Sequence, residues 1–180
     1  MKSIKKGNFV MLKIEIRRKP LVIGVMGGHE APMEILEDAR RIGEEIARRG
    51  HVLLTGGGAG VMKAASEGAF RAGGLVLAVI PSDRVRPLEG YPNEFVDITI
   101  CTGMADARNA INAKTPHIII AIDGGWGTIS EIAHAMRSGT PVIGLKTPAI
   151  DLPHGNCFTA AATVGEALAH LDHLLDAFLK

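Results

Sequence analysis

The sequence predicts an α/β protein in which a doubly wound, mainly parallel sheet of six or seven strands lies between two layers of helices. Short apolar runs rich in β-branched residues recur along the chain, as expected of strands buried on both faces. Segments with helical spacing of apolar residues separate these runs, and that alternation is typical of a parallel sheet covered by helices. Glycine-rich turns follow several of the runs, where α/β proteins bind their ligands.

Six apolar runs account for the expected strands, and two further segments are expected to be irregular. The strands are predicted at residues 21–26, 51–54, 75–80, 95–100, 117–122 and 141–145. Residues 81–94 contain three prolines, which predicts a long loop between the third and fourth strands. Residues 146–162 are also expected to lack regular structure.

Helical patterns fill the intervals between these strands. The first helix is expected from Pro32 to Gly50, with Ile35, Ile42 and Ile46 on one face and Gly50 just past its end. The other helices are expected at residues 61–72, through Arg108 and Ala113, at 129–137, and from a Thr163–Glu166 capping box onward.

Length and composition favour one globular domain over residues 20–180. The chain has 180 residues, of which 47% are hydrophobic and 22% charged. A basic extension, residues 1–19, precedes this domain. It is expected to be either an edge strand or a disordered arm, or to be untranslated if Met11 is the true start.

Charge, cysteine content and hydropathy argue against several kinds of partner. The formal net charge is +1, which provides no global field for nucleic acid or a membrane surface. Cys101 and Cys157 make no disulfide framework, so a cytoplasmic location is expected. No apolar stretch has the length of a membrane span. The seven histidines are scattered along the chain, and His170 and His173 are expected on the solvated face of a helix. No metal site is therefore expected.

The run Asp123-Gly124-Gly125-Trp126-Gly127-Thr128-Ile129-Ser130-Glu131 predicts an anion site. It directly follows the apolar strand at residues 117–122, and its glycines let backbone N–H groups approach a ligand closely. Thr128 is expected to be the N-cap of the next helix. A strand, a glycine loop and a helix N-terminus together favour a phosphate group.

Other glycine turns are expected at the same edge, because right-handed crossovers bring the carboxyl ends of parallel strands together. The alternative for each is a tight turn that serves packing alone. The candidate ligand-binding glycines are Gly27, Gly28, Gly56, Gly57, Gly58, Gly60, Gly103, Gly124, Gly125 and Gly127.

Two charged residues are the candidate catalytic groups, and each has a structural alternative. Arg108 is either a solvated helix arginine or a fixed guanidinium that binds phosphate or ribose. Glu131 either completes a capping box with Thr128 or lies beside a bound sugar as a base. His29 is either a solvated loop residue or a contact to a base. Trp126 either stacks on a base or packs against protein.

Residues 21–145 resemble the LOG family, often mislabelled lysine decarboxylase. The run from Gly124 to Glu131 resembles that family's Pro-Gly-Gly-x-Gly-Thr-x-x-Glu motif after its first position, and the segment from Met104 to Arg108 resembles its Met-x-x-x-Arg segment. The glycine loop from Thr55 to Met62 resembles a group of short prokaryotic Rossmann-like proteins, which is related to LOG enzymes and to molybdenum cofactor carrier proteins.

The resemblance implies hydrolysis of the N-glycosidic bond of a nucleoside 5′-monophosphate, without a cofactor, in a homodimer or homotetramer. It places the phosphate on the 124–127 glycines and Thr128, with Arg108 on phosphate or ribose. Glu131 would assist attack of water on an oxocarbenium-like sugar. Gly57, Gly58 and Met62 would line the pocket near sugar and base, and Met104 belongs to the same motif set.

Three departures from the family pattern leave a second function open. Asp123 replaces the family's proline, Asn109 replaces a lysine and Ser130 replaces a glutamate. The retained Arg108 and Glu131 favour the hydrolase as the main interpretation. The departures favour the alternative, a non-catalytic carrier or sensor of a phosphate-bearing nucleotide or molybdopterin. No lysine lies in a motif that supports a pyridoxal-dependent decarboxylase.

Overall fold

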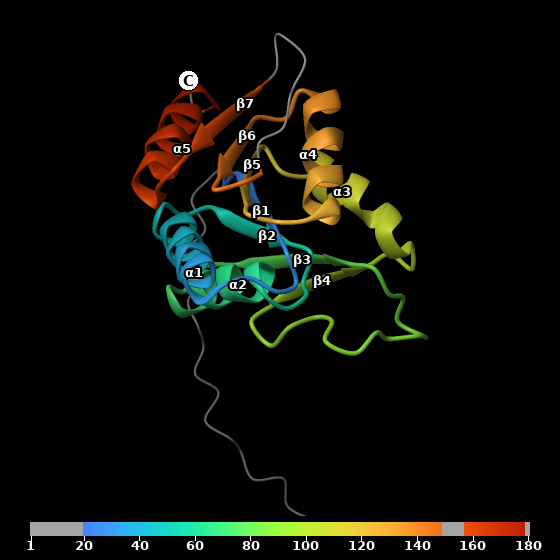
Figure 1. Ribbon diagram of the computed structural model, residues 1–180. Helices are drawn as coiled ribbons and strands as arrows, with labels where there is room; N and C mark the ends of the chain where they lie inside the picture. Colours follow the sequence, from blue (N-terminus) through green and yellow to red (C-terminus); the bar gives the residue numbers. More distant parts are fainter. Residues whose placement is uncertain (1–19, 149–156, 179–180) are drawn as a thin grey trace, which may run out of the picture.

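The computed structural model describes residues 20–148 and 157–178, and its described part contains seven parallel strands in one sheet (Figure 1). Their order across the sheet is β4-β3-β2-β1-β5-β6-β7. The strands are β1 (Val22–Gly27), β2 (Val52–Thr55), β3 (Val76–Ile80), β4 (Ile98–Cys101), β5 (Ile118–Ile122), β6 (Val142–Leu145) and β7 (Phe158–Ala161). The predicted α/β class and parallel sheet are confirmed.

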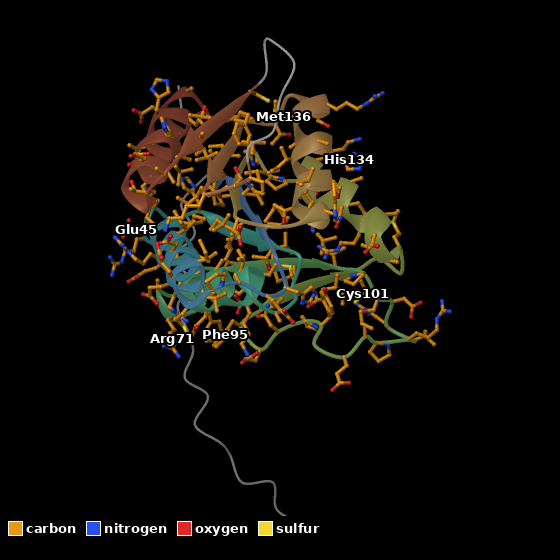
Figure 2. The ribbon with its side chains drawn as sticks, in the orientation of Figure 1. Glu45, Arg71, Phe95, Cys101, His134 and Met136 are labelled. Carbon is orange, nitrogen blue, oxygen red and sulfur yellow. The ribbon has the colours of Figure 1, made fainter. Side chains whose placement is uncertain are left out.

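Five α-helices and a short 3₁₀ helix form the outer layers. They are α1 (Met33–Arg48), α2 (Val61–Arg71), η1 (Ala105–Arg108), α3 (Asn109–Lys114), α4 (Trp126–Ser138) and α5 (Val164–Phe178). Helices α1, α2 and α5 cover one face of the sheet, and α3 and α4 cover the other (Figure 1). Their buried side chains form one hydrophobic core on each side of the sheet. Figure 2 shows the charged side chains of Glu45 and Arg71 on the outer side of the α1–α2 layer.

The continuous apolar run at residues 118–122 forms the inner strand β5. All five of its residues are buried, because both faces are covered. Ile118, Ile120 and Ile122 contribute to the core under α1, α2 and α5, whereas Ile119 and Ala121 contribute to the core under α3 and α4. This alternation is the period-two pattern of a strand within a two-sided core.

The structure differs from the sequence expectations at several element boundaries. The expected strand at residues 95–100 begins only at Ile98, and residues 81–97 form an irregular connection from β3 to β4. Part of the segment expected to be irregular forms β7, which pairs with β6. The helix expected from residue 129 begins at Trp126. The basic extension at 1–19 lies outside the described residues.

The chain reverses its direction across the sheet between β1 and β5. Strands β1 to β4 extend to one side and β5 to β7 to the other, and Gly27 pairs with Ile122 at the carboxyl ends of the two central strands. The connections after β1 and β5 therefore leave this edge on opposite faces and open a crevice between them. Among the described helices, none is long and apolar enough to cross a membrane.

Helices α1 and α2 pack closely because a glycine of each faces the backbone of the other. A Cβ atom on Gly43 would lie 2.0 Å from the carbonyl oxygen of Ala65, and one on Gly68 would lie 2.0 Å from that of Arg40. Both distances fall far below van der Waals contact, so a side chain at either position would force the helices apart.

We expect Gly43→Ala and Gly68→Ala each to lower the free energy of unfolding by about 1–3 kcal/mol, because overpacking outweighs the better helix propensity of alanine. Urea denaturation followed by circular dichroism measures the change. Gly165→Ala in α5 is the matched control: an added Cβ meets only the Thr163 hydroxyl, at 3.9 Å, so this variant should be neutral or more stable. Unchanged stability of both α1–α2 variants would contradict this account of the helix contact.

Candidate functional site

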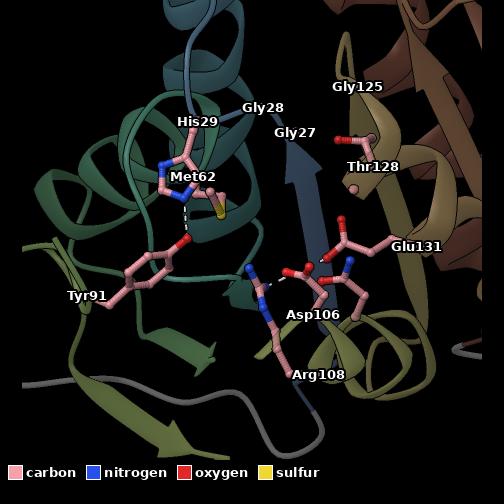
Figure 3. A pocket seen from close by; sticks show the side chains of 12 residues that line it. Gly27, Gly28, His29, Met62, Tyr91, Asp106, Arg108, Gly125, Thr128 and Glu131 are labelled. Carbon is pink, nitrogen blue, oxygen red and sulfur yellow. Dashed lines mark hydrogen bonds and ion pairs between the residues drawn. The ribbon is translucent and has the colours of Figure 1, made fainter. Parts of the chain in front are cut away.

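A pocket of about 380 Å³ opens in the crevice between β1 and β5 (Figure 3). Five segments that follow strands contribute to it: the turns after β1 and β5, the start of α2 after β2, the loop after β3, and η1–α3 after β4. Its lining residues are Gly27, Gly28, His29, Met62, Tyr91, Asp106, Arg108, Asn109, Gly125, Gly127, Thr128 and Glu131. The structure thus brings eight of the fifteen predicted site residues to one cavity.

One side of the pocket is the N-terminus of α4. Gly125 is its N-cap residue, and Ile129 N–H donates to the Gly125 carbonyl at 3.0 Å. Thr128 therefore lies in the first turn and the prediction that it caps the helix was wrong. Gly124 has φ +103° and does not line the pocket, and a Cβ there would lie 2.4 Å from the Thr128 hydroxyl oxygen. First-turn N–H groups lack helical partners, so this wall can receive an anion.

Arg108 lies in the floor of the pocket with only 8% of its surface exposed. Its Nε and Nη1 atoms are buried without a hydrogen-bond partner in the described part of the chain. Nη1 lies 3.8 Å from Glu131 Oε1, an ion-pair distance but too long for a hydrogen bond. The solvated-arginine alternative is therefore wrong for Arg108. A buried guanidinium with unused donors is expected to find an acceptor, because leaving such groups unsatisfied is costly.

Glu131 is the buried carboxylate of the pocket. Asn112 Nδ2 donates to Glu131 Oε1 at 2.8 Å, so the carboxylate faces α3 rather than serving as the partner of a capping Thr128. Burial is the main cause that raises the pKa of Glu131 to about 7, while Asn112 and Arg108 act to lower it. Asn112 was not predicted, although it lies four residues after Arg108 and so on the same side of a helical segment.

Two of the three departures from the LOG pattern are neighbours in space. Asn109 Nδ2 donates to the Ser130 hydroxyl oxygen at 2.9 Å, and that hydroxyl donates to the Gly127 carbonyl at 2.7 Å. This neutral chain of hydrogen bonds joins α3 to the start of α4 beside the pocket. Arg108 is consequently the only lining arginine or lysine of the pocket among the residues that the structure describes.

The glycine loop after β2 does not line the pocket but provides room for groups that do. A Cβ on Gly56 would lie 2.2 Å from Arg108 Nη1, and one on Gly58 would lie 2.7 Å from His29 Cε1.

The other two glycines of this loop pack against neighbouring segments. Gly57 has φ +74° and faces Ala78 and Ile80 of β3. A Cβ on Gly60 would lie 2.4 Å from the Gly28 carbonyl oxygen. These four glycines permit close packing rather than contact this cavity.

His29, Met62 and Tyr91 form the side of the pocket opposite α4 (Figure 3). The His29 Nε2 atom and the Tyr91 hydroxyl share a hydrogen bond, and their rings meet edge to face with centroids 5.3 Å apart. Tyr91 was not predicted. The available signal was its position: it is the only tyrosine of the chain and lies in the loop that leaves β3 at the ligand-binding edge.

The remaining predicted residues lie outside this pocket. Gly103 borders a separate surface cavity of about 460 Å³ with Ser82, Asp83 and Arg86, and Met104 is 47% exposed. Trp126 is 86% exposed at the start of α4, between two lining glycines. No cluster of three or more His, Cys, Asp or Glu residues suited to a metal ion occurs among residues 20–148 and 157–178.

Comparison with known proteins shows similarity to phosphoribohydrolases and to molybdenum cofactor proteins. Residues 20–173 match the model of the SLOG cluster4 family. An uncharacterized protein from Archaeoglobus fulgidus is 44% identical over 132 residues, which cover 73% of this chain and 84% of that protein. A cytokinin riboside 5′-monophosphate phosphoribohydrolase from Mycobacterium tuberculosis is 34% identical over 108 residues, which cover 59% of this chain but only 56% of the enzyme.

Two solved structures are similar over a larger share of their length. The molybdenum cofactor binding protein from Rippkaea orientalis has a TM-score of 0.78 and 35% identity. The molybdenum cofactor carrier protein from Chlamydomonas reinhardtii has a TM-score of 0.76 and 35% identity. Each comparison covers 88% of this chain and 99% of the relative.

We expect Glu131→Gln to become increasingly stabilising relative to wild type as the pH rises from about 5 to 8. A carboxyl with its pKa raised from 4.5 to about 7 holds its proton in the folded state over a range where the unfolded chain has lost it. The wild type therefore loses stability as pH rises through this window, by on the order of 3 kcal/mol for this group, and the amide does not.

Urea denaturation of both proteins at pH 5, 6, 7 and 8 measures this difference. Glu89→Gln, at an exposed position, is the control and should follow wild type. A constant difference in unfolding free energy between Glu131→Gln and wild type across this range would contradict the raised pKa.

Proposed function

Since the chain belongs to the SLOG cluster4 family, we propose that it binds a small phosphate-bearing ligand in the pocket between β1 and β5, as a carrier or sensor that does not turn the ligand over. The ligand class is a nucleotide or a molybdopterin-like compound. The observation that carries this proposal is the buried guanidinium of Arg108, whose Nε and Nη1 atoms have no partner in the described chain.

The geometry supports a phosphate as the group that Arg108 receives. The guanidinium presents parallel donors that match two phosphate oxygens, and burial strengthens such charge-assisted hydrogen bonds. The N-terminus of α4 lies on the other side of the same cavity, where its dipole also favours negative charge (Figure 3). Bound between these two features, a phosphate would be neutralised from two directions.

The extent of similarity favours a carrier over a hydrolase. The molybdenum cofactor proteins match this chain over 99% of their own length, whereas the phosphoribohydrolase from Mycobacterium tuberculosis matches over 56% of its length. The neutral Asn109–Ser130 pair further separates this site from the LOG pattern of charges. Both differences support binding without hydrolysis.

A phosphoribohydrolase is the second candidate, and Glu131 is the observation that favours it. A buried carboxyl with a pKa of about 7 is half ionised near neutral pH, which suits a general base. It lines the same cavity as Arg108. In a hydrolase, Glu131 would accept a proton from the attacking water while Arg108 held the phosphate.

We expect Arg108→Ala to reduce affinity for nucleoside monophosphates or a pterin phosphate at least tenfold, because it removes the buried cation of the pocket. Isothermal titration with AMP, GMP, CMP, IMP, UMP and neopterin phosphate measures binding. The same mixtures, separated by chromatography, report any free base and ribose 5-phosphate. Arg137→Ala, an exposed arginine of α4, is the matched control and should bind like wild type.

Three results separate the possibilities. Binding without release of base supports a carrier or sensor. Release of base that is lost in both Arg108→Ala and Glu131→Gln would replace the carrier by the hydrolase. Equal affinity of wild type and Arg108→Ala for every ligand would contradict the role of Arg108.

Gly56→Ala tests the position of Arg108 without removing its charge. The added methyl would lie 2.2 Å from Arg108 Nη1 and 2.7 Å from Met62 Sδ, so both side chains must move. We expect a loss of affinity of roughly tenfold in the same titrations, while thermal unfolding remains cooperative. Wild-type affinity in this variant would show that ligand binding does not need the guanidinium where the structure places it.

A further inference from the structure

We propose that the wall formed by Tyr91, His29 and Met62 receives a planar nitrogen heterocycle of the ligand, and that Tyr91 is its main specificity-determining residue. This inference rests on the proposed function, because it concerns the same pocket. The proposed function places the phosphate of the ligand near Arg108 and α4. The present inference places the ring of the ligand on the opposite side of the pocket.

Tyr91 is held at the pocket by a rigid anchor two residues away. Asn93 is 93% buried, its N–H donates to the Gly57 carbonyl at 2.8 Å, and its Nδ2 donates to the Gly58 carbonyl at 3.0 Å. Its Oδ1 accepts a hydrogen bond from Phe95 N–H at 3.2 Å. The loop from β3 to β4 has no helix, yet at this point it is fastened to the loop that follows β2.

The other two members of the wall are also fixed by the backbone beneath them. Val61 N–H at the start of α2 donates to the Gly28 carbonyl at 3.0 Å, which holds the turn that carries His29. Met62 follows directly and is buried. Gly58 leaves the space into which both side chains pack, because a Cβ there would lie 2.7 Å from His29 Cε1 and 2.8 Å from Met62 Cε.

The chemistry of this wall differs from that of the α4 side. It presents two rings and a thioether, groups that contact the face of an aromatic ring favourably. Figure 3 shows these three residues across the cavity from Thr128 and Glu131, with Arg108 between the two sides. The cavity of about 380 Å³ lies within the usual range for a small-molecule site. A phosphorylated heterocycle matches these two sides, because it has an anionic phosphate and a planar ring.

Two ligand types share this chemistry, the purine of a nucleotide and a phosphorylated pterin. GMP, neopterin phosphate and ribose 5-phosphate are therefore the probes, since the first two carry a ring and the third carries the phosphate alone. Isothermal titration gives the affinities. Trp126 is the only tryptophan of the chain and lies between the lining residues Gly125 and Gly127, so its fluorescence is a second readout.

In wild type we expect at least one ring-bearing probe to bind about tenfold or more tightly than ribose 5-phosphate. Tyr91→Ala should remove most of that difference, because it should lower the affinity for the ring-bearing probe by a clearly larger factor than the affinity for ribose 5-phosphate. Tyr91→Phe keeps the ring and loses only the hydroxyl, so it should retain most of the difference. The ligand class is then given by whichever of GMP and neopterin phosphate exceeds ribose 5-phosphate in affinity by the larger factor: a nucleotide for GMP, a pterin for neopterin phosphate.

Several results would overturn the inference. If wild type bound all three probes with equal affinity, the heterocycle would add nothing to binding. The inference would then be wrong, although the proposal of phosphate binding would stand. An equal loss for ring-bearing and ring-free probes in Tyr91→Ala would assign Tyr91 a structural role only. Unchanged affinities in Tyr91→Ala, with cooperative thermal unfolding, would also contradict it. Failure of all three probes to bind wild type would count against the proposed function as well, and so differs from each of these outcomes.

Discussion

The burial of the Arg108 guanidinium at the edge where β1 and β5 meet is the constraint on which the rest of the site depends. A cation removed from water is costly unless acceptors surround it. Here the neighbouring carboxylate, Glu131, lies 3.8 Å away and is itself held by Asn112. Gly56 leaves the space for the guanidinium. The cation is thus partly compensated within the chain. Its Nε and Nη1 atoms have no hydrogen-bond partner in the described residues, and Arg108 lines the cavity that we propose holds an anion.

The glycines of this protein serve two physical purposes that look alike in the sequence. Gly125 and Gly127 border the cavity at the start of α4, where the absence of side chains exposes backbone N–H groups. Gly56 and Gly58 instead make room for side chains from other segments, which supply the wall and the floor of the pocket. The space that Gly56 and Gly58 leave is filled by side chains from distant parts of the chain. The local sequence around these two glycines therefore does not distinguish them from the glycines of an anion-binding loop.

The sequence predicted most of the fold because the central strands carry local signals. The apolar run before Asp123 is buried on both sides in β5, as its pattern indicated. Arg108 and Glu131 were predicted as site residues because they lie in recognisable segments, and both line the pocket. Tyr91 and Asn112 were missed since their roles arise from contacts between segments far apart in the chain, such as the 62-residue separation of Tyr91 and His29. β7 was missed because four residues, half of them exposed, give no clear strand pattern.

The electrostatics of the pocket couple tight phosphate binding to protonation of Glu131. A phosphate paired with Arg108 would lie near Glu131, because the two side chains are only 3.8 Å apart. Its negative charge would offset the influence of Arg108, which lowers the pKa of Glu131, and would raise that pKa further above 7. The carboxyl would then be protonated at neutral pH and could donate a hydrogen bond to the ligand, but it could not accept a proton from water. This coupling supports our proposal that the pocket holds a phosphorylated ligand and does not cleave it.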